Sequence, residues 1–211
     1  RFFQFILALL GASSGQRGPL SWITSHNAHH KYSDKPGDPH SPNTLNWFYA
    51  YYGWVHKKGS LPTDPRYYDI YKKQPEIIFI NNYPTVGVAL FISALLLISS
   101  AAESLSFSQA IVYGFIIPTH MTLQATCLVN LVAHLKGSRR YDLTDQSRNV
   151  WWLLPLSLGE NWHNNHHKHP TSANNSRHFL ELDFIYWGLK ALSSLGIIWD
   201  IKNYNEKASK N

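Results

Sequence analysis

The sequence predicts an all-α membrane protein, built as a transmembrane helical hairpin with a cytosolic helical cap that carries histidine clusters. Three observations predict this fold class. Two long runs of residues contain no charged side chain, basic residues flank these runs but are absent between them, and the pattern H-x-x-H-H occurs once on each side of the runs.

The hairpin is predicted over residues 84–135. Pro84 to Ala102 is a run of 19 residues without a charge, enough to cross about 30 Å of hydrocarbon. The second run, from Leu105 to Leu135, contains no Asp, Glu, Lys or Arg. It is longer than a membrane requires, so we expect its far end to project into water. The short polar turn Glu103-Ser104 joins the two runs. A buried pair of soluble helices is the alternative, but runs of this length rarely occur in small soluble cores.

The basic residues predict how the hairpin is oriented. They lie before it and after it, at Lys57, Lys58, Arg66, Lys72 and Lys73 and at Lys136, Arg139, Arg140 and Arg148. Because cytoplasmic flanks carry the excess of Lys and Arg, both ends of the hairpin are expected to face the cytoplasm. The net charge of +6 then serves contact with anionic lipid or an acidic partner. Nucleic-acid binding is not expected, since the basic residues lie beside apolar spans.

The segments outside the hairpin are expected to lie in the cytosol. Residues 1–83 begin with an apolar helix, Phe2 to Leu10, too short to span a bilayer. We therefore expect these residues to be the end of an N-terminal membrane helix followed by a cytosolic segment. Residues 136–211 are expected to form the cytosolic cap and tail. The chain opens at Arg1 without an initiator methionine, so we expect a fragment whose upstream part is missing. Its one cysteine excludes an intrachain disulfide and fits a reducing compartment.

The two histidine patterns predict a metal site. They span His26 to His30 and His163 to His167, and with 12 histidines in 211 residues chance would supply about 0.04 copies. Residues three and four apart share one face of a helix, so each triplet can aim three imidazoles at one point. Six imidazoles suit one or two first-row transition metals, such as two irons, and suit calcium or magnesium badly.

Three segments carry a resemblance to a known family. Residues 18–34 with Asp38-Pro39-His40 resemble the second histidine box of membrane fatty acid desaturases, and residues 159–167 look like the third box. The amino-acid sequences of these boxes most resemble those of the delta-nine acyl-lipid and acyl-CoA branch of the family. Between the boxes, Asn130-Leu131-Val132-Ala133-His134 is similar to that family's helix-end motif. The resemblance covers roughly residues 1 to 190.

The resemblance implies a set of site residues. By the family pattern, Asn130 would act on iron through a water, while Trp22 and Thr126 would flank the bend of an acyl channel. Asp38 and His40 would support the site from behind the ligands. The iron ligands themselves would be His26, His29, His30, His134, His163, His166 and His167.

The same resemblance implies an enzyme that uses two irons, dioxygen and two electrons to introduce a cis double bond into an acyl chain. Its electron donor would be a small acidic protein of the ferredoxin or cytochrome b5 type. Its substrate would be an acyl lipid or an acyl-CoA. Asn27 stands where acyl-CoA desaturases usually place an arginine, and Arg17-Gly18 replaces polar residues that meet the CoA portion. These departures favour lipid-bound acyl chains.

Three alternatives stay open. The nearest is a hydroxylase or ketolase of the same membrane di-iron group. A membrane metal-binding or carrier protein is an alternative of another class. The third is an inactive fragment, because the family's first box, H-x-x-x-x-H, is absent from the chain.

Overall fold

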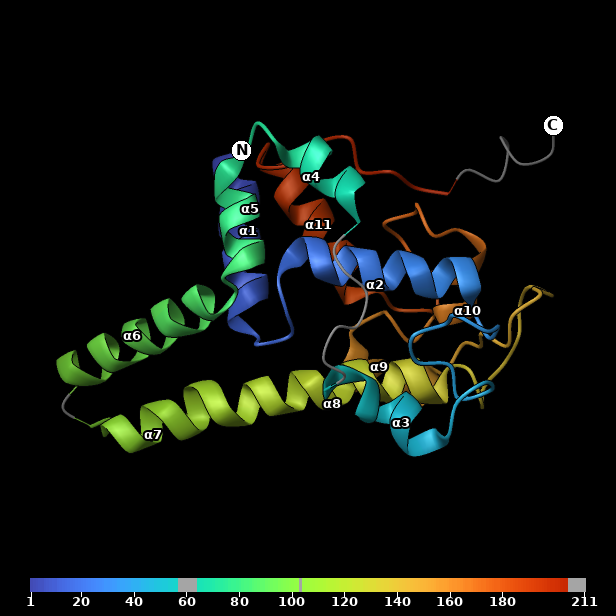
Figure 1. Cartoon of the computed structure of the whole chain (residues 1–211), viewed down its shortest axis with the longest axis horizontal. Helices are drawn as coiled ribbons and strands as arrows, with labels where there is room; N and C mark the ends of the chain where they lie inside the picture. Colours follow the sequence, from blue (N-terminus) through green and yellow to red (C-terminus); the bar gives the residue numbers. More distant parts are fainter. Residues whose placement is uncertain (57–63, 103, 205–211) are drawn as a thin grey trace. The chain divides into compact units, whose positions relative to one another are not determined.

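The computed structural model describes residues 1–56, 64–102 and 104–204 (Figure 1). Within these residues the regular secondary structure is helical, and β-pairing is limited to two isolated bridges, from Ser138 to Asn149 and from Asn149 to Trp162. The predicted all-α class is thereby confirmed. The chain divides into two compact units, one of residues 1–31 and 56–124 and the other of residues 32–55 and 125–211. The three-segment division expected from the sequence stays a prediction.

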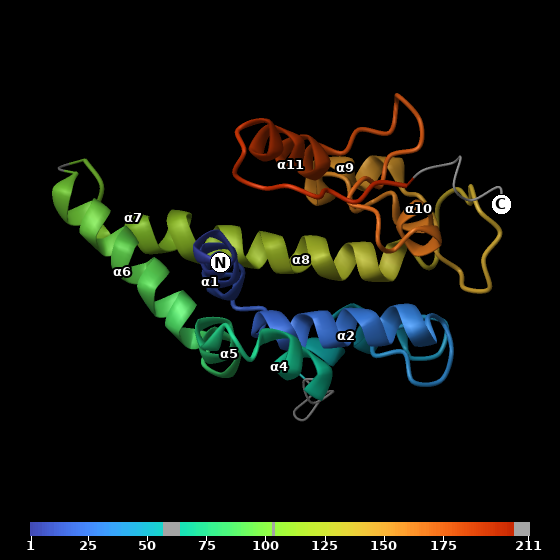
Figure 2. The same ribbon diagram turned by 90° about the horizontal axis from the view of Figure 1, so that it is seen from above.

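The first unit is a set of apolar helices. Its elements are α1 (Phe2–Ser13), most of α2 (Pro19–Tyr32), α4 (Pro65–Tyr71), α5 (Pro75–Asn82), α6 (Thr85–Ala101), α7 (Phe107–Ile111), a π-helix (Val112–Ile116) and the first half of α8 (Ile117–Val132). Helix α6 packs closely on α1, because a Cβ added at Gly87 would lie 2.9 Å from the Cβ of Ala12. Figures 1 and 2 show α6 and α7 meeting at one end as the two arms of a hairpin.

The long arm of this hairpin is continuous. Helix α7 begins with a capping box, in which the side chains of Ser106 and Gln109 each accept a hydrogen bond from the other's backbone N–H. From there, α7, the π-helix and α8 form a helix of 26 residues, the one helix in the described part of the chain that is long and apolar enough to cross a bilayer. Helices α5 and α6 would make a second span only if the pair, bent by 87°, counted as one.

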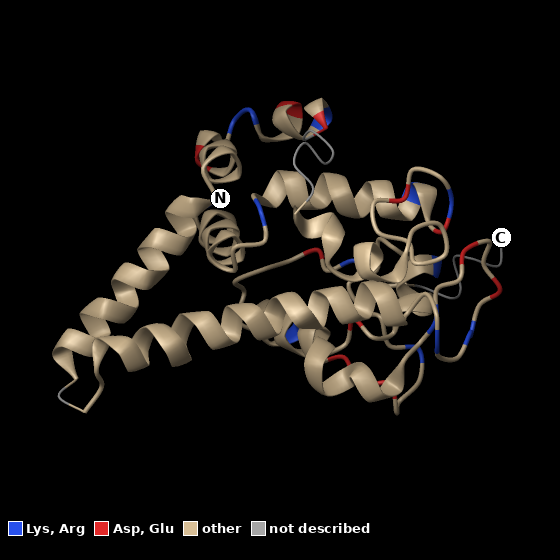
Figure 3. Cartoon of the chain, turned by 60° about the horizontal axis from the view of Figure 1, so that its bottom comes forward, with Lys and Arg blue, Asp and Glu red and all other residues tan. Residues whose placement is uncertain are grey.

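Two helices therefore stand where the sequence predicts the hairpin. The ribbon of α6, α7 and α8 carries no Lys, Arg, Asp or Glu (Figure 3). Of the predicted connecting turn, Glu103 lies outside the described residues, as do Lys57 and Lys58 among the flanking basic residues. The π-helix was not predicted, because its sequence Val-Tyr-Gly-Phe-Ile differs little in composition from the α-helices around it.

The second unit consists of short helices held by long loops. They are α3 (Trp47–Tyr51), two 3₁₀ turns (Gly53–His56 and Trp151–Leu153), α9 (Leu154–Ser157), α10 (His163–Lys168) and α11 (Phe184–Ser194). Their small core consists of Val129 and Ala133, at the end of α8, packed against Val150 and Leu153. This core anchors the loops around the end of α8, where the functional candidates gather.

Candidate metal centre

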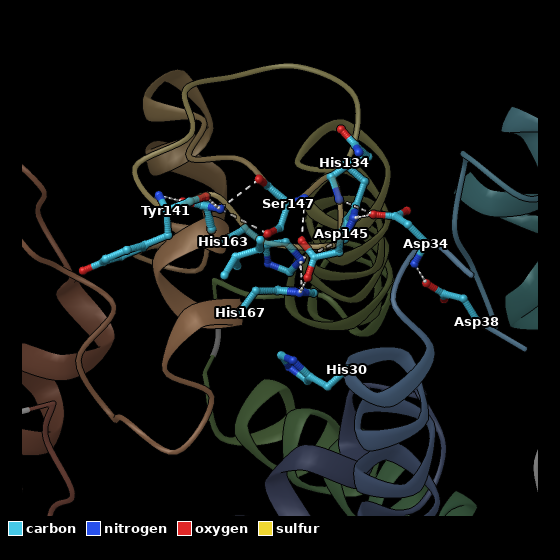
Figure 4. A network of polar contacts seen from close by, with 12 residues as sticks. His30, Asp34, Asp38, His134, Tyr141, Asp145, Ser147, His163 and His167 are labelled. Carbon is cyan, nitrogen blue, oxygen red and sulfur yellow. Dashed lines mark hydrogen bonds and ion pairs between the residues drawn. The ribbon is translucent and has the colours of Figure 1, made fainter. Parts of the chain in front are cut away.

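Three histidine rings of the second unit meet at the end of α8. His134 follows α8, and His163 and His167 lie one turn apart on α10. The Nε2 atom of His163 lies 3.1 Å from Nε2 of His134 and 3.0 Å from Nε2 of His167. The ligand atoms of these three residues all lie within 4.8 Å of one another. We call them the three-histidine cluster (Figure 4).

Asp34 holds the far side of the His134 ring. Its Oδ2 lies 2.7 Å from Nδ1 of His134 and accepts a hydrogen bond of 2.7 Å from the backbone N–H of Gln146. Its Oδ1 accepts from the Ser41 hydroxyl at 2.6 Å and from the Asn43 amide at 2.8 Å. Burial raises the pKa of the Asp34 carboxyl, but the hydrogen bond and charge of His134, with the bonds from Asn43 and Ser41, lower that pKa well below its ordinary value. The group is therefore an ionised carboxylate.

Asp145 holds His167 in the same way. Its Oδ2 lies 3.1 Å from Nδ1 of His167, and its Oδ1 accepts a hydrogen bond of 2.9 Å from the backbone N–H of Ser147. Burial raises the pKa of the Asp145 carboxyl, but the hydrogen bonds from His167 and Ser147 and the charge of His167 outweigh it and lower that pKa well below its ordinary value. Figure 4 shows both carboxylates beside their rings.

These contacts decide which ring nitrogens can bind a metal. An ionised carboxylate only accepts hydrogen bonds, so Nδ1 of His134 and of His167 must carry the proton. On a neutral ring, Nε2 is then left with a lone pair. Both lone pairs point at Nε2 of His163, which can donate one proton to only one of them. A cation between the three nitrogens removes this conflict, and imidazole nitrogen suits iron, zinc or copper. The residues present therefore fit a transition metal.

Buried asparagines fix the position of α10. Oδ1 of Asn149 accepts hydrogen bonds from the backbone N–H groups of Asn164 and Asn165, at 3.0 and 3.2 Å. These groups lie in the first turn of α10, where the helix itself offers no acceptor. The amide of Asn149 also donates to Oδ1 of Asn165 at 2.9 Å. The two asparagines of the H-N-N-H-H pattern thus form hydrogen bonds within the protein. The histidines on either side of them remain available to the metal site.

Asn164 has the largest share of these contacts. Its Oδ1 accepts from the backbone N–H groups of Arg140 and Tyr141, at 2.9 and 2.7 Å. Its amide donates to the carbonyls of Tyr141 and Ser147, at 3.0 and 3.1 Å. The side chain is fully buried. It ties α10 to the loop that carries Asp145.

The second histidine box lies on α2, as its spacing predicts. Nε2 of His30 lies 3.1 Å from Nε2 of His26, and the ring of His29 lies 5.8 Å from that of His30 between centroids. Trp22 stacks on His26 with 5.0 Å between centroids and 20° between planes. Asn27, the spacer residue, is hydrogen bonded to Tyr67. His26, His29 and His30 belong to the first unit, so their convergence with the three-histidine cluster stays a prediction.

The remaining predicted residues have these surroundings. His166 is outside the three-histidine cluster, and its ring lies 6.0 Å from that of His163 between centroids. Asn130 and Thr126 are half-buried on α8, one and two helical turns before His134. Asp38 accepts hydrogen bonds from the backbone N–H groups of Asp34 at 2.9 Å and of His40 at 3.1 Å. Asp38 therefore shapes the loop that presents Asp34, and His40 is buried in that loop beside Trp54. Their functional roles stay predictions.

Asp34 and Asp145 were missed by the sequence reasoning. Asp34 ends the segment that resembles the second histidine box, and Asp145 belongs to no box, but neither was assigned a role from the sequence. One signal was available, because ligand histidines commonly donate their other N–H to a carboxylate. That rule says such partners exist but not where in the sequence they lie.

Comparisons with known proteins show the family to which the chain belongs. The sequence model of the fatty acid desaturase family matches residues 1–196. Delta-9 acyl-lipid desaturase 1 of Arabidopsis thaliana is 31% identical over 96% of this chain and 65% of its own length. The sn-1 stearoyl-lipid 9-desaturase of Anabaena variabilis is 30% identical over 98% of this chain and 74% of its own length. An enzyme of the same name from Synechocystis is 32% identical over 100% of this chain and 64% of its own length. The chain thus spans about two thirds of the length of these relatives, and it belongs to the fatty acid desaturase family.

Proposed function

We propose that this chain is the greater part of a membrane desaturase that introduces a cis double bond into an acyl chain, using dioxygen and two electrons at a histidine-ligated pair of irons. The observation that carries the proposal is the three-histidine cluster, in which two carboxylates hold two rings with Nε2 aimed at a common point. Because the chain belongs to the fatty acid desaturase family, we assign desaturation of an acyl chain to that cluster.

The chain's own residues perform the holding and shielding. Bound iron would supply the oxidation of an unactivated C–H bond with dioxygen, which no side chain can supply. Asp34 and Asp145 fix the tautomers of their histidines, and the asparagines of α10 fix its position. His134 and His163 are buried, which limits the access of water to the reacting centre. We propose His26, His29, His30 and His166 as further ligands, with Asn130 acting through a water.

A membrane setting is supported by the surface of the first unit. Large apolar side chains are exposed on both arms of the hairpin, among them Leu97 at 70% and Met121 at 55%. Only 11% of the apolar window in the 26-residue helix is buried, whereas the core helix of a soluble protein is mostly buried. Exposed apolar surface on this scale marks contact with lipid or another protein. We propose a multi-pass protein with its active site on the cytoplasmic side, following the bias of Lys and Arg.

The substrate we propose is the acyl chain of a membrane lipid, drawn past Trp22 and Thr126. The named relatives above are acyl-lipid desaturases, and Asn27 and Arg17 depart from the acyl-CoA pattern. An acyl-CoA is the competing substrate. The basic flanks of the hairpin favour an acidic electron carrier of the ferredoxin or cytochrome b5 type.

The test is lipid analysis of a host that lacks its own desaturase. The host expresses residues 1–211 or, separately, the longest reading frame that contains them, each together with a ferredoxin or a cytochrome b5 and its reductase. Fatty acids of the membrane lipids are then analysed by gas chromatography and mass spectrometry, in air and under nitrogen. We expect a new monounsaturated acid that forms only in air. The replacement His163→Ala should abolish it. The replacement His178→Ala should not, because His178 is exposed and lies outside the cluster.

Other outcomes would overturn the proposal. A hydroxylated or oxo product would instead assign a hydroxylase or ketolase. Iron uptake by the cells without any new acyl product would favour a metal carrier. Iron-loaded protein that makes no product, with a reduced donor present, would exclude desaturation.

A further inference from the structure

We propose that Asp34 and Asp145 are positioning residues of the metal centre, which hold the Nδ1 protons of His134 and His167 so that both rings bind metal through Nε2. This inference rests on the proposed function, because it assigns these carboxylates a role toward the metal of the same site. Neither residue is a ligand itself. Each acts through the histidine that it touches.

Asp34 is fully committed to this role. A carboxylate has about four acceptor positions, and four donors occupy them: Nδ1 of His134, the backbone N–H of Gln146, the Ser41 hydroxyl and the Asn43 amide. The backbone N–H of Gln146, the Ser41 hydroxyl and the Asn43 amide can each only donate a hydrogen bond to an ionised carboxylate. The fourth contact, from His134, must therefore also be a donation, and the tautomer follows from the whole set of contacts.

The backbone at Asp34 supports the same conclusion. Asp34 follows the end of α2 and has a φ of +57°, in the left-handed region that is strained for residues other than glycine. Asparagine and aspartate tolerate this region better than other side chains. Such strain persists where a residue is needed for another purpose. Here the purpose is the carboxylate, which glycine lacks.

The loop of Asp145 links the two carboxylates. Gln146, whose N–H donates to Asp34, is the next residue after Asp145. The guanidinium of Arg139 donates to the backbone carbonyls of Leu143 and Asp145, at 2.6 and 3.0 Å. These bonds hold the loop in a fixed path. Movement of either carboxylate would therefore disturb the other.

The expected consequence is on metal affinity. A carboxylate behind a ligand histidine raises the basicity of the ring and fixes its orientation, and its loss typically costs about 10- to 100-fold in affinity or activity. Two such groups also place two negative charges behind neutral ligands. We therefore expect both carboxylates to strengthen binding of a divalent or trivalent iron.

The test compares three matched variants of the full chain in lipid nanodiscs. Asp34→Asn and Asp145→Asn keep the size of the side chain and remove its charge, and asparagine is also tolerated at positive φ. Asp142→Asn is the control, because the Asp142 side chain is fully exposed and its ion pair among the described residues is with Arg139, at 3.3 Å. The affinity for Fe²⁺ alone is measured anaerobically, by competition with a chromogenic chelator. Helix content and melting temperature are recorded without metal.

We expect each cluster variant to bind Fe²⁺ about 10- to 100-fold more weakly than the parent chain, and the control to bind it unchanged. Equal affinities in all four proteins would overturn this inference and leave the proposed function standing. A parent chain that binds no Fe²⁺ would overturn both. A purely structural role would lower the melting temperature and leave the affinity of the folded fraction unaltered.

A second measurement keeps the inference falsifiable if a variant fails to fold. Nitrogen NMR of the parent chain, labelled at histidine with ¹⁵N, reports which ring nitrogen carries the proton. We expect Nδ1 of His134 and Nδ1 of His167 to carry a proton in the metal-free protein, because each lies against a carboxylate oxygen. An unprotonated Nδ1 on either ring would overturn the assignment for that ring.

Discussion

At the scale of single residues, the site depends on two kinds of polar side chain. Some face the metal site, and others hold the loops and helix α10 in place by hydrogen bonds. The spacing of histidines in the sequence selected His163 and His167, and the family resemblance of residues 130–134 added His134. It could not reveal Asp34 or Asp145, because a carboxylate partner is chosen by the fold and not by its distance along the chain. The spacing of the histidines also did not predict a structural role for the asparagines between them. Their hydrogen bonds are visible only once the loop at 138–149 is in place.

Asn164 offers the clearest prediction at this scale. Replacing it with alanine removes the partner of the part-buried backbone N–H groups of residues 140 and 141, of the part-buried carbonyl of Tyr141 and of the buried carbonyl of Ser147. Because each buried group left unsatisfied costs about 1–3 kcal/mol, we expect Asn164→Ala to lower the free energy of unfolding by at least about 2 kcal/mol. Chemical denaturation followed by circular dichroism measures it.

The matched control is Asn203→Ala. The Asn203 amide is exposed and makes one hydrogen bond of 3.0 Å, to the hydroxyl of Tyr186. Its loss should change the stability by less than about 0.5 kcal/mol. Equal effects of the two replacements would contradict the structural role given to Asn164.

At the scale of elements, α10 depends on the turn that precedes it. Leu158 and Gly159 both have positive φ, at +55° and +135°. The carbonyl of Leu158 accepts hydrogen bonds from Phe184 and Ile185, in the first turn of α11. Asp183 caps α11 by accepting from the N–H of Tyr186 at 2.9 Å. The turn therefore joins α9, α10 and α11.

Gly159→Ala is the prediction for this element. A Cβ at this position would lie 2.5 Å from Oδ1 of Asp183, on a backbone that side chains rarely adopt. We expect a lower melting temperature together with weaker Fe²⁺ binding, because α10 carries His163 and His167. Differential scanning fluorimetry and the chelator competition measure the two effects.

Gly188→Ala provides the contrast within the same unit. Gly188 lies inside α11 with nothing within 4 Å of an added Cβ. Alanine there should stabilise the helix by up to about 1 kcal/mol and leave metal binding unchanged. Loss of Fe²⁺ binding in this variant would show that the site responds to α11 as a whole rather than to the turn.

The long helices show how far the sequence alone could be taken. Two long runs of uncharged residues predicted two helical arms. Both arms exist, at α6 and from α7 to α8. The π-helix of residues 112–116 could not be predicted, because one extra residue per turn is selected by packing between helices. Gly114 shows this packing: a Cβ there would lie 2.9 Å from a methyl group of Leu95 on α6.

At the scale of the whole molecule, the exposed apolar arms are the feature that a membrane would explain. Met121 lies near the middle of the 26-residue helix and is 55% exposed. A lysine at the centre of a spanning helix costs about 2.5–3.5 kcal/mol of insertion free energy. We therefore expect Met121→Lys to reduce the share of protein that stays in membranes after carbonate extraction.

Ile70→Lys is the control for this prediction. Ile70 is 65% exposed on α4, outside the apolar arms. The same change there should leave the membrane fraction unaltered. A membrane fraction that is unaffected by either lysine would contradict the spanning role of residues 107–132.

The buried amides have a consequence for how the protein ages. Hydrolysis of the Asn164 side chain to a carboxylate would replace an N–H donor by an oxygen opposite the carbonyls of Tyr141 and Ser147. In the folded chain this amide is shielded from water, whereas in an unfolded chain it is open to attack. Each episode of heating would then leave a fraction of molecules that can no longer rebuild the loop. Loss of function on heating would become irreversible through chemical damage at a spacer residue, with every histidine still intact.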